Sequence, residues 1–153
     1  MDMPKPSPEQ QALSILVGEW LGEEQILPGP FDPVGGPALG RVHNRLALDG
    51  FAVIQDYEQE RKGAVNFRGH GVFRWDLRES CYMLHWFDSL RFAPATFRGT
   101  LEGAVLILTA KQDQGFARAV FDFTQPGWYA YRQEVSPDGN NWTAFMTGEY
   151  RRQ

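Results

Sequence analysis

Three histidines are the side chains best suited to acid–base chemistry, because imidazole is the side chain whose ordinary pKa lies near neutral pH. Asp56 is expected to lie opposite His43 in a hairpin, and a carboxylate partner of this kind can make a histidine a general base. The same hairpin directs both side chains outward, so we interpret them as a cross-strand pair on the surface. His70 lies between two glycines and is expected to be solvated.

The third histidine, His85, is the one whose direction the alternation of residues leaves open. Its strand, near residues 81–89, can direct either the even-numbered or the odd-numbered side chains inward, and both sets contain large apolar groups. An inward His85 could hydrogen-bond a ligand or ligate a haem iron. If His85 lies at the rim of the barrel or in the core, a neighbouring polar group would instead form the hydrogen bonds of its ring.

Other catalytic constellations are not apparent in the sequence. There is no G-x-S-x-G motif, and no cluster of cysteines and histidines has the spacing of a zinc site. The one cysteine, Cys81, excludes an intramolecular disulfide and is interpreted as a small packing residue. We therefore expect no catalytic residues, no metal and no cofactor.

Charge and composition argue against several classes of partner. The chain has 15 Lys plus Arg against 19 Asp plus Glu, dispersed singly rather than in a basic stripe, so nucleic acid is not expected to bind. No segment is apolar for long enough to span a membrane or to act as a secretion signal, so a cytoplasmic protein is expected. The high aromatic content, 14%, favours a β-rich core or a pocket for a small apolar molecule.

The positions of these residues depend on the fold, which the periodicity predicts to be all-β. Residues 1–8 are expected to be a flexible tail, with Ser7 capping a short helix that begins at Pro8. From Gly18 onward apolar residues alternate with a period of two, and turn signals recur between them. About ten successive strands in an open sheet would leave its two edges exposed, so the sheet is expected to close into a barrel. Residues 9–153 are therefore predicted to form one closed antiparallel up-and-down β-barrel with the N-terminal helix plugging one end.

The first turn expected to fix the register is Asp49-Gly50, a strong signal for a tight hairpin. Counting outward from it places Asn44 opposite Gln55, with Tyr57 on the same face. That face is apolar apart from these groups, whereas the opposite face is ionic. The inward polar groups either hydrogen-bond one another or serve as fixed contacts for a ligand, and the sequence does not separate these alternatives.

The second such turn is Glu102-Gly103, a weaker signal of the same kind. It predicts that Phe97 lies opposite Leu108. Their face is interpreted as the inward one, because the other face carries Arg98.

The segment 65–75 alternates most clearly of all. Its odd-numbered residues are expected to point inward: Val65, Phe67, Gly69, Gly71, Phe73 and Trp75. The two glycines would leave a gap beside four large side chains.

Glu24 lies on the first predicted strand, where alternation counted from Trp20 directs its side chain inward. It is therefore expected to be paired or to lie near the mouth of the barrel, because an unpaired buried carboxylate is costly.

A further motif lies at the start of the first predicted strand. Gly18-Glu19-Trp20 resembles the Gly-x-Trp signature that opens the barrel of lipocalins, fatty-acid-binding proteins and nitrobindins, together called calycins. The resemblance implies that Gly18 and Trp20 are structural residues. It places Trp20 at the base of the barrel, with Arg151 or Arg152 stacked nearby.

The resemblance extends over most of the chain, about residues 13–151. Gly69-x-Gly71, then Tyr82, then Trp86-Phe87-Asp88-Ser89 resemble the pattern of a bacterial calycin-like family of unknown function. This implies a barrel with an internal cavity. It implies no established activity, because fold alone does not carry function.

We therefore predict a protein that holds a small apolar or amphipathic ligand inside its barrel. The predicted ligand contacts are Asn44, Gln55, Tyr57, Phe67, Gly69, Gly71, Phe73, Trp75, His85, Trp86, Phe97 and Leu108. The alternative is a structural or homodimerisation module with a filled barrel, whose outer residues Phe116, Val120 and Ile107 form the contact face. Haem is disfavoured because nitrobindins place their ligand histidine close to the C-terminus, and no histidine follows His85. An uncharacterised enzyme is a further alternative.

Overall fold

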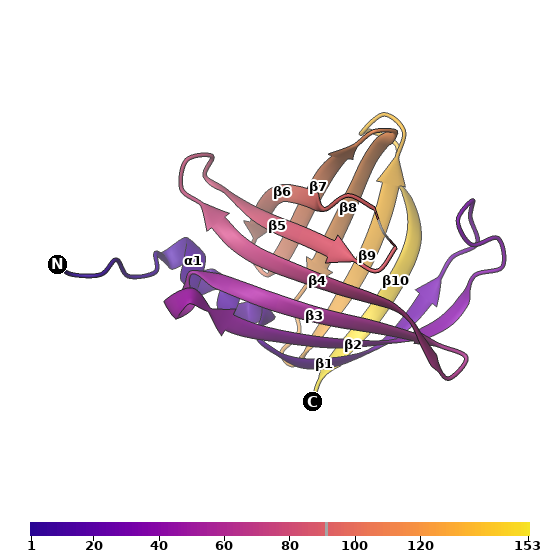
Figure 1. Ribbon diagram of the computed structural model, residues 1–153, viewed down its shortest axis with the longest axis horizontal. Coiled ribbons are helices and arrows are strands. Elements are labelled where there is room, and N and C mark those ends of the chain that lie inside the picture. Colours follow the sequence, from indigo (N-terminus) through magenta and orange to yellow (C-terminus); the bar gives the residue numbers. More distant parts are fainter. Residues whose placement is uncertain (91) are drawn as a thin grey trace.

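The computed structural model describes residues 1–90 and 92–153, and ten antiparallel strands in it close into a barrel (Figure 1). The strands are β1 (Gly18–Ile26), β2 (Gly36–Ala47), β3 (Ala52–Arg61), β4 (Ala64–Asp76), β5 (Cys81–Asp88), β6 (Ala95–Glu102), β7 (Val105–Gln112), β8 (Gly115–Asp122), β9 (Trp128–Ser136) and β10 (Thr143–Arg152). Each strand pairs with its neighbours in sequence, and β1 also pairs with β10, which closes the sheet. The predicted all-β barrel is confirmed.

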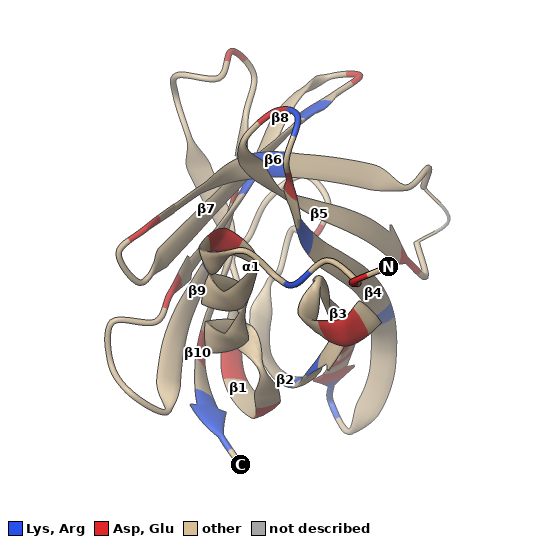
Figure 2. Ribbon diagram, turned by 90° about the vertical axis from the view of Figure 1, so that its left-hand side faces the viewer, with Lys and Arg blue, Asp and Glu red and all other residues tan. Residues whose placement is uncertain are grey.

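A short helix covers one end of the barrel. α1 (Pro8–Ala12) begins after Ser7, whose hydroxyl accepts a hydrogen bond from the backbone N–H of Gln10, and a 3₁₀ turn over Leu13–Leu16 follows. Proline suits the first helical position because its missing N–H would have no partner there. Both leucines of the 3₁₀ turn are buried, and Figure 2 shows α1 lying across this end of the barrel. The predicted helix is confirmed, and no helix in the described part of the chain is long and apolar enough to cross a membrane.

The hairpin between β2 and β3 has the register that its turn predicts. Asp49 and Gly50 occupy the two central positions with positive φ angles of 56° and 93°, as this type of hairpin turn requires. Asn44 pairs with Gln55, and the rest of β2 faces the expected residues of β3. The prediction is confirmed because two residues that tolerate the left-handed region fix the point at which the chain reverses.

The hairpin between β6 and β7 reverses one residue later than predicted. Its central residues are Gly103 and Ala104 rather than Glu102 and Gly103, so Leu108 pairs with Gly99 and not with the predicted phenylalanine. Gly103 takes a positive φ of 60° at the first central position, where a residue with a Cβ would be strained. The predicted register is therefore wrong. Moving the turn by one residue shifts the partner of each β7 residue by two positions along β6. A shift of two keeps the same side chains on the same face, so Leu108 still points inward.

A β-bulge changes the direction of one residue near the start of β4. Gln59 pairs with Phe67 and Glu60 pairs with Val65, which leaves Asn66 as the extra residue. Val65 is consequently 37% exposed on the outer face, and the prediction that it points inward is wrong. A bulge reverses the alternation locally, which counting with a period of two does not detect.

Trp20 joins β1 to β10 at the helical end of the barrel. Its indole N–H donates to the carbonyl of Leu16 at 3.0 Å, and the guanidinium of Arg152 lies 4.4 Å from the ring centroid. Gly18 has a φ of +148°, which residues with a side chain rarely adopt, and a Cβ there would also lie 2.5 Å from that guanidinium, so glycine suits this position. Gly18 and Trp20 thus have the structural positions that the resemblance implies.

Candidate functional site

The barrel interior contains most of the side chains predicted to contact a ligand. Those on its inner face are Asn44, Gln55, Tyr57, Phe67, Gly69, Gly71, Phe73, Trp75, Trp86, Phe97 and Leu108. Phe73 and Leu108 are buried, whereas Phe67 and Trp86 stay partly exposed toward the end of the barrel opposite α1. The structure brings these residues around one interior, and their contact with a ligand stays a prediction.

His85 is the predicted ligand contact that lies outside the barrel. The even-numbered side chains of β5 point inward, so His85 is on the outer face. Its Nε2 accepts a hydrogen bond from Nε of Arg74 at 2.9 Å, and its Nδ1 lies 3.3 Å from the hydroxyl of Thr96. Burial lowers the pKa of His85, and the positive charges of Arg74 and Arg98 lower it further. His85 therefore contributes neither to the interior nor to a haem site there, which corrects its inclusion among the ligand contacts.

The gap expected beside Gly69 and Gly71 is occupied. The indole of Trp86 lies over both glycines, so a Cβ on either one would meet its ring, and Leu84 also approaches Gly71. Nε1 of Trp86 donates to the carboxylate of Asp88 at 3.0 Å. The two glycines thus let a ring from the neighbouring strand approach the backbone closely, and the prediction that they leave a gap is wrong.

Glu24 on β1 is buried inside the barrel with only 4% of its surface exposed. Its carboxylate accepts hydrogen bonds from the hydroxyl of Tyr57 at 2.8 Å and the amide of Gln59 at 3.1 Å, and also from the hydroxyl of Tyr150. Gly40 makes room for this group, because a Cβ there would collide with the carboxylate. The expectation that Glu24 points inward and is paired is confirmed. We call these four hydrogen-bonded side chains the Glu24 cluster.

Several polar groups in the interior lack a hydrogen-bond partner among the described residues. They include the hydroxyls of Tyr129 and Tyr131, the amide of Gln55 and Oδ1 of Asn44, whereas Nδ2 of Asn44 donates to the carbonyl of Leu16 at 2.9 Å. Within the described chain, only Oδ1 of Asn44 is both unpaired and wholly occluded, so the other groups border space that a water-sized molecule can reach. Asn44 and Gln55 therefore do not satisfy each other across their hairpin.

No basic side chain offsets the charge of Glu24 within the described interior. The buried residues described include no Lys, Arg or His. Arg61, at the far end of β3, instead pairs with Asp32 and donates to the carbonyl of Gly35 at 2.9 Å. Burial raises the pKa of Glu24, and the three neutral donors offset this only in part. Burial and the negative charge of Glu24 also raise the pKa of Tyr131, so this unpaired hydroxyl shares the same electrostatic environment.

The sequence reasoning missed the tyrosines that β9 and β10 bring to Glu24. Tyr150 belongs to the Glu24 cluster, and its ring stacks on that of Tyr129 with centroids 4.6 Å apart. The signal that could have found it is the pairing of the first strand with the last. That pairing places Gly148 opposite Glu24, and Tyr150 lies two residues further along on the same face.

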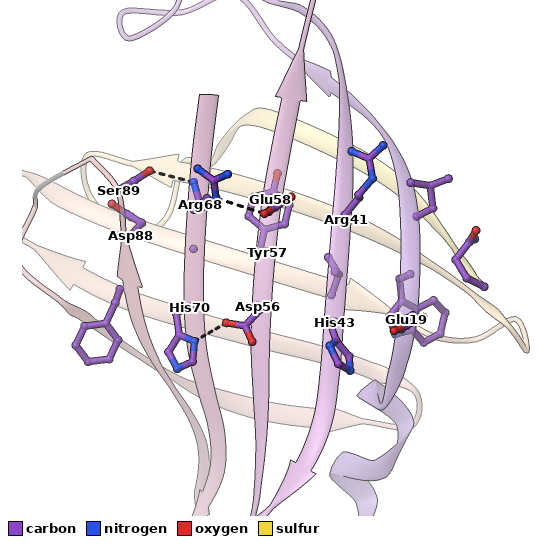
Figure 3. Close-up of a pocket in the computed structure, with 16 residues that line it drawn as sticks. Glu19, Arg41, His43, Asp56, Tyr57, Glu58, Arg68, His70, Asp88 and Ser89 are labelled. Atoms are coloured by element: carbon purple, nitrogen blue, oxygen red, sulfur yellow. Dashed lines mark hydrogen bonds and ion pairs between the residues drawn. The ribbon is translucent and has the colours of Figure 1, made fainter. Parts of the chain in front are cut away.

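A second candidate site is a groove of about 920 Å³ on the outer face of β1–β5 (Figure 3). Glu19, His43, Asp56 and His70 lie side by side across four strands in it. His43 lies opposite Asp56 on the outer face, as predicted, but the carboxylate of Asp56 bonds Nδ1 of His70 on the other neighbouring strand at 2.7 Å. The side chains of His70 and Asp56 are 48% and 61% exposed, and an ion pair so open to water contributes little. No group of three metal-ligating side chains is placed to hold an ion within residues 1–90 and 92–153.

Another groove, of about 930 Å³, crosses the outer face of β7–β10 and the adjoining edges of β1 and β2. Ile107 and Val120 pair directly within it, next to Arg118. Phe116, the third residue expected at a dimer face, instead packs beside Gly139 of its own chain, since a Cβ on that glycine would lie 3.3 Å from the ring. Phe116 is partly exposed but lies outside this groove, and a dimer contact through the three residues stays a prediction.

Comparisons with known proteins agree with the fold. A family model described as "Protein of unknown function (DUF1579)" matches residues 5–152. The crystal structure of Rv2717c from M. tuberculosis is similar, with a TM-score of 0.70, 16% sequence identity and coverage of 96% of this chain and 98% of that one. The S-type phycobiliprotein lyase CpeS from Guillardia theta is also similar, with a TM-score of 0.60, 12% identity and coverage of 97% and 98%. Such low identities establish the fold alone, and a search of curated proteins found no match.

Proposed function

The chain belongs to the DUF1579 family of proteins of unknown function, and we propose that it binds a small apolar or amphipathic molecule inside its barrel. The observation that carries this proposal is the set of interior polar groups that have no partner among the described residues. Buried polar groups normally have a hydrogen-bond partner, and a ligand or water supplies one where the protein does not. Apolar and aromatic walls around a few polar groups are the usual composition of a small-molecule site.

Trp86 is the side chain that the ligand displaces in this proposal. Its indole covers Gly69 and Gly71, is partly exposed, and has its ring centroid 6.5 Å from that of Tyr57. A single hydrogen bond to Asp88 holds its Nε1. Rotation of this side chain uncovers the glycines and gives access to Tyr57 without a change in the backbone.

A pair of variants on β6 tests entry past Trp86. Ala95 is the register partner of Trp86 on the inner face, whereas Thr96 points outward. Ala95→Phe therefore narrows the opening, and Thr96→Phe adds an aromatic ring outside it. Native mass spectrometry of gently purified protein identifies any bound compound, and titration with the neutral fluorescent probe N-phenyl-1-naphthylamine measures affinity.

The expected result is that wild type and Thr96→Phe bind the probe, while Ala95→Phe binds it at least about tenfold more weakly, a loss of roughly 1.4 kcal/mol. Equal affinity in the two variants would place the probe outside the barrel and contradict the proposal. The absence of both a copurified compound and probe binding in wild type would contradict it as well.

Homodimerisation through the outer groove of β7–β10 is a second candidate function. The observation that favours it is the direct pairing of two partly exposed apolar residues, Ile107 and Val120. Clustered apolar side chains on an outer face are typical of contact surfaces. Sedimentation at several concentrations tests this function. A dimer that Val120→Lys dissociates supports it, and a monomer at every concentration refutes it.

A further inference from the structure

The Glu24 cluster has an acceptor site to spare. An ionised carboxylate offers about four lone-pair positions and donates nothing. Three groups donate to this carboxylate, namely the hydroxyls of Tyr57 and Tyr150 and the amide of Gln59. All three donors are neutral, so they stabilise the carboxylate by hydrogen bonding without cancelling its charge. The hydroxyl of Tyr57 lies 2.9 and 2.8 Å from the two carboxylate oxygens but has one proton to donate, so three donor protons share the four positions and one further donor can be accepted.

The group that this carboxylate lacks is a cation. Buried carboxylates in proteins are normally paired with a basic side chain or a metal, because an uncompensated buried charge is costly. The described buried residues include no Lys, Arg or His, and Arg61 is engaged by Asp32. Asp88 adds a second carboxylate, on the inner side of β5 beside Trp86. The part of the interior that is described therefore presents negative charge and no positive charge.

A protonated amine matches these groups. An ammonium has three donors and no acceptor, so it can bond the free position of Glu24 and still donate to oxygens such as the unpaired hydroxyl of Tyr131. Aromatic rings also attract cations, and Tyr57, Tyr131 and Trp86 line this region. A carboxylate brings only acceptors and a like charge, so it would be repelled by Glu24.

We infer that the interior site takes amphiphiles whose polar end is a protonated amine and rejects the corresponding carboxylates. This inference rests on the proposed function, since it names the ligand class for the same site. It distinguishes this barrel from one that holds fatty acids, for which a basic side chain in the interior would be the suitable partner.

Three ligands that share one twelve-carbon chain test the inference: dodecylamine, dodecanol and dodecanoate. Each competes with N-phenyl-1-naphthylamine for wild-type protein at pH 7, the alcohol below its solubility limit and the amine and the carboxylate below their micelle concentrations. The expected order of affinity is amine, then alcohol, then carboxylate, with at least about a tenfold difference between the first and the last. Ala95→Phe is the control for amines that merely adhere to the acidic surface, and it should weaken amine binding.

Two variants test whether Glu24 causes the preference for amines. Glu24→Gln keeps the shape of the side chain and removes its charge, so the preference for amine over alcohol should fall at least about fivefold. Glu134→Gln is the matched control, because Glu134 is also buried but lies on the outer face and pairs with Arg118. It should leave the preference as in wild type.

The outcomes separate the inference from the proposed function. Dodecanoate that binds as tightly as dodecylamine, with the neutral probe still displaced, refutes the inference and leaves the proposed function standing. Failure of wild type to bind the probe and all three ligands refutes both. An amine preference that survives in folded Glu24→Gln also refutes the inference. Should that variant not fold, Tyr131→Phe replaces it, and it should weaken amine binding more than alcohol binding.

Discussion

Two glutamates, Glu24 and Glu134, are buried in opposite electrostatic surroundings, and their substitution by glutamine should change stability with opposite dependence on pH. Burial raises the pKa of Glu24 above its ordinary value of 4.5, although hydrogen bonds from Tyr150, Tyr57 and Gln59 act in the other direction. Burial also acts to raise the pKa of Glu134, but there the hydrogen bonds and charges of two arginines outweigh it and the pKa is lowered.

The direction of each effect follows from proton linkage. Because the pKa of Glu24 is higher in the folded state than its ordinary value of 4.5, its contribution to stability is complete below 4.5 and is lost as pH rises through the folded pKa. Each unit of difference corresponds to about 1.4 kcal/mol. Glutamine resembles the protonated acid, so the stability of Glu24→Gln relative to wild type should rise between pH 4 and pH 8.

The matched variant should behave in the opposite way. The pKa of Glu134 is lower in the folded state than its ordinary value of 4.5, so its contribution is present above 4.5 and is lost as pH falls through the folded pKa. Its partners Arg118 and Arg132 are 26% and 49% exposed, and this exposure to solvent screens the interaction. Glu134→Gln should therefore be less stable than wild type by about 1 kcal/mol at pH 7.

Urea denaturation monitored by circular dichroism, repeated at pH 4, 5, 6, 7 and 8, measures both differences. Comparison of each variant with wild type at the same pH cancels all the other titrating groups. A free energy difference for Glu24→Gln that stays flat or falls with rising pH would mean that the carboxylate is not desolvated in the folded state. That result would contradict the burial of Glu24 without a counter-charge.

Three further outcomes are expected elsewhere in the barrel. Gly69→Ala should cost about 1 to 3 kcal/mol in urea denaturation, because its Cβ enters the indole that covers this glycine, whereas Gly29→Ala has open space and should be near neutral. Arg152→Gln should cost about 1 kcal/mol by removing the cation over the tryptophan ring beneath it, against less than about 0.5 kcal/mol for exposed Arg151→Gln. An NMR titration should place the pKa of His85 below its ordinary value of 6.5, so that its contribution to stability is lost as pH falls below 6.5. A pKa at or above 6.5 would contradict the observed hydrogen bond from its arginine neighbour.

The sequence predicts those parts of the fold that local chemistry determines. Asp49 and Gly50 fix a hairpin because both tolerate positive φ, and all the pairs of β2 with β3 follow from that one turn. Glu102 and Gly103 were a poorer guide, because only one of them tolerates the strained position. The chain there shifts to put Gly103 first.

The interior was harder to predict because it depends on contacts between distant strands. Both faces of β5 carry large apolar residues, so the direction of Trp86 could not be decided from alternation, and without it the filling of the space over Gly69 and Gly71 could not be foreseen. Glu24 was placed inward correctly. Its partner Tyr150 is 126 residues away and becomes a neighbour only when the barrel closes.

Packing alone does not account for the Glu24 cluster. A barrel interior gains most from well-packed apolar side chains, and replacing buried ionic groups by such residues is often neutral or stabilising. Burial instead raises the pKa of Glu24, and the hydrogen bonds from its three neutral donors offset this only in part. Trp20 at the other end of the barrel has both its indole N–H and its ring face satisfied within the chain. The chain thus supplies the hydrogen-bond acceptor and the cation that Trp20 contacts, but the described interior supplies no positive charge for Glu24. We expect that positive charge to come from a bound molecule.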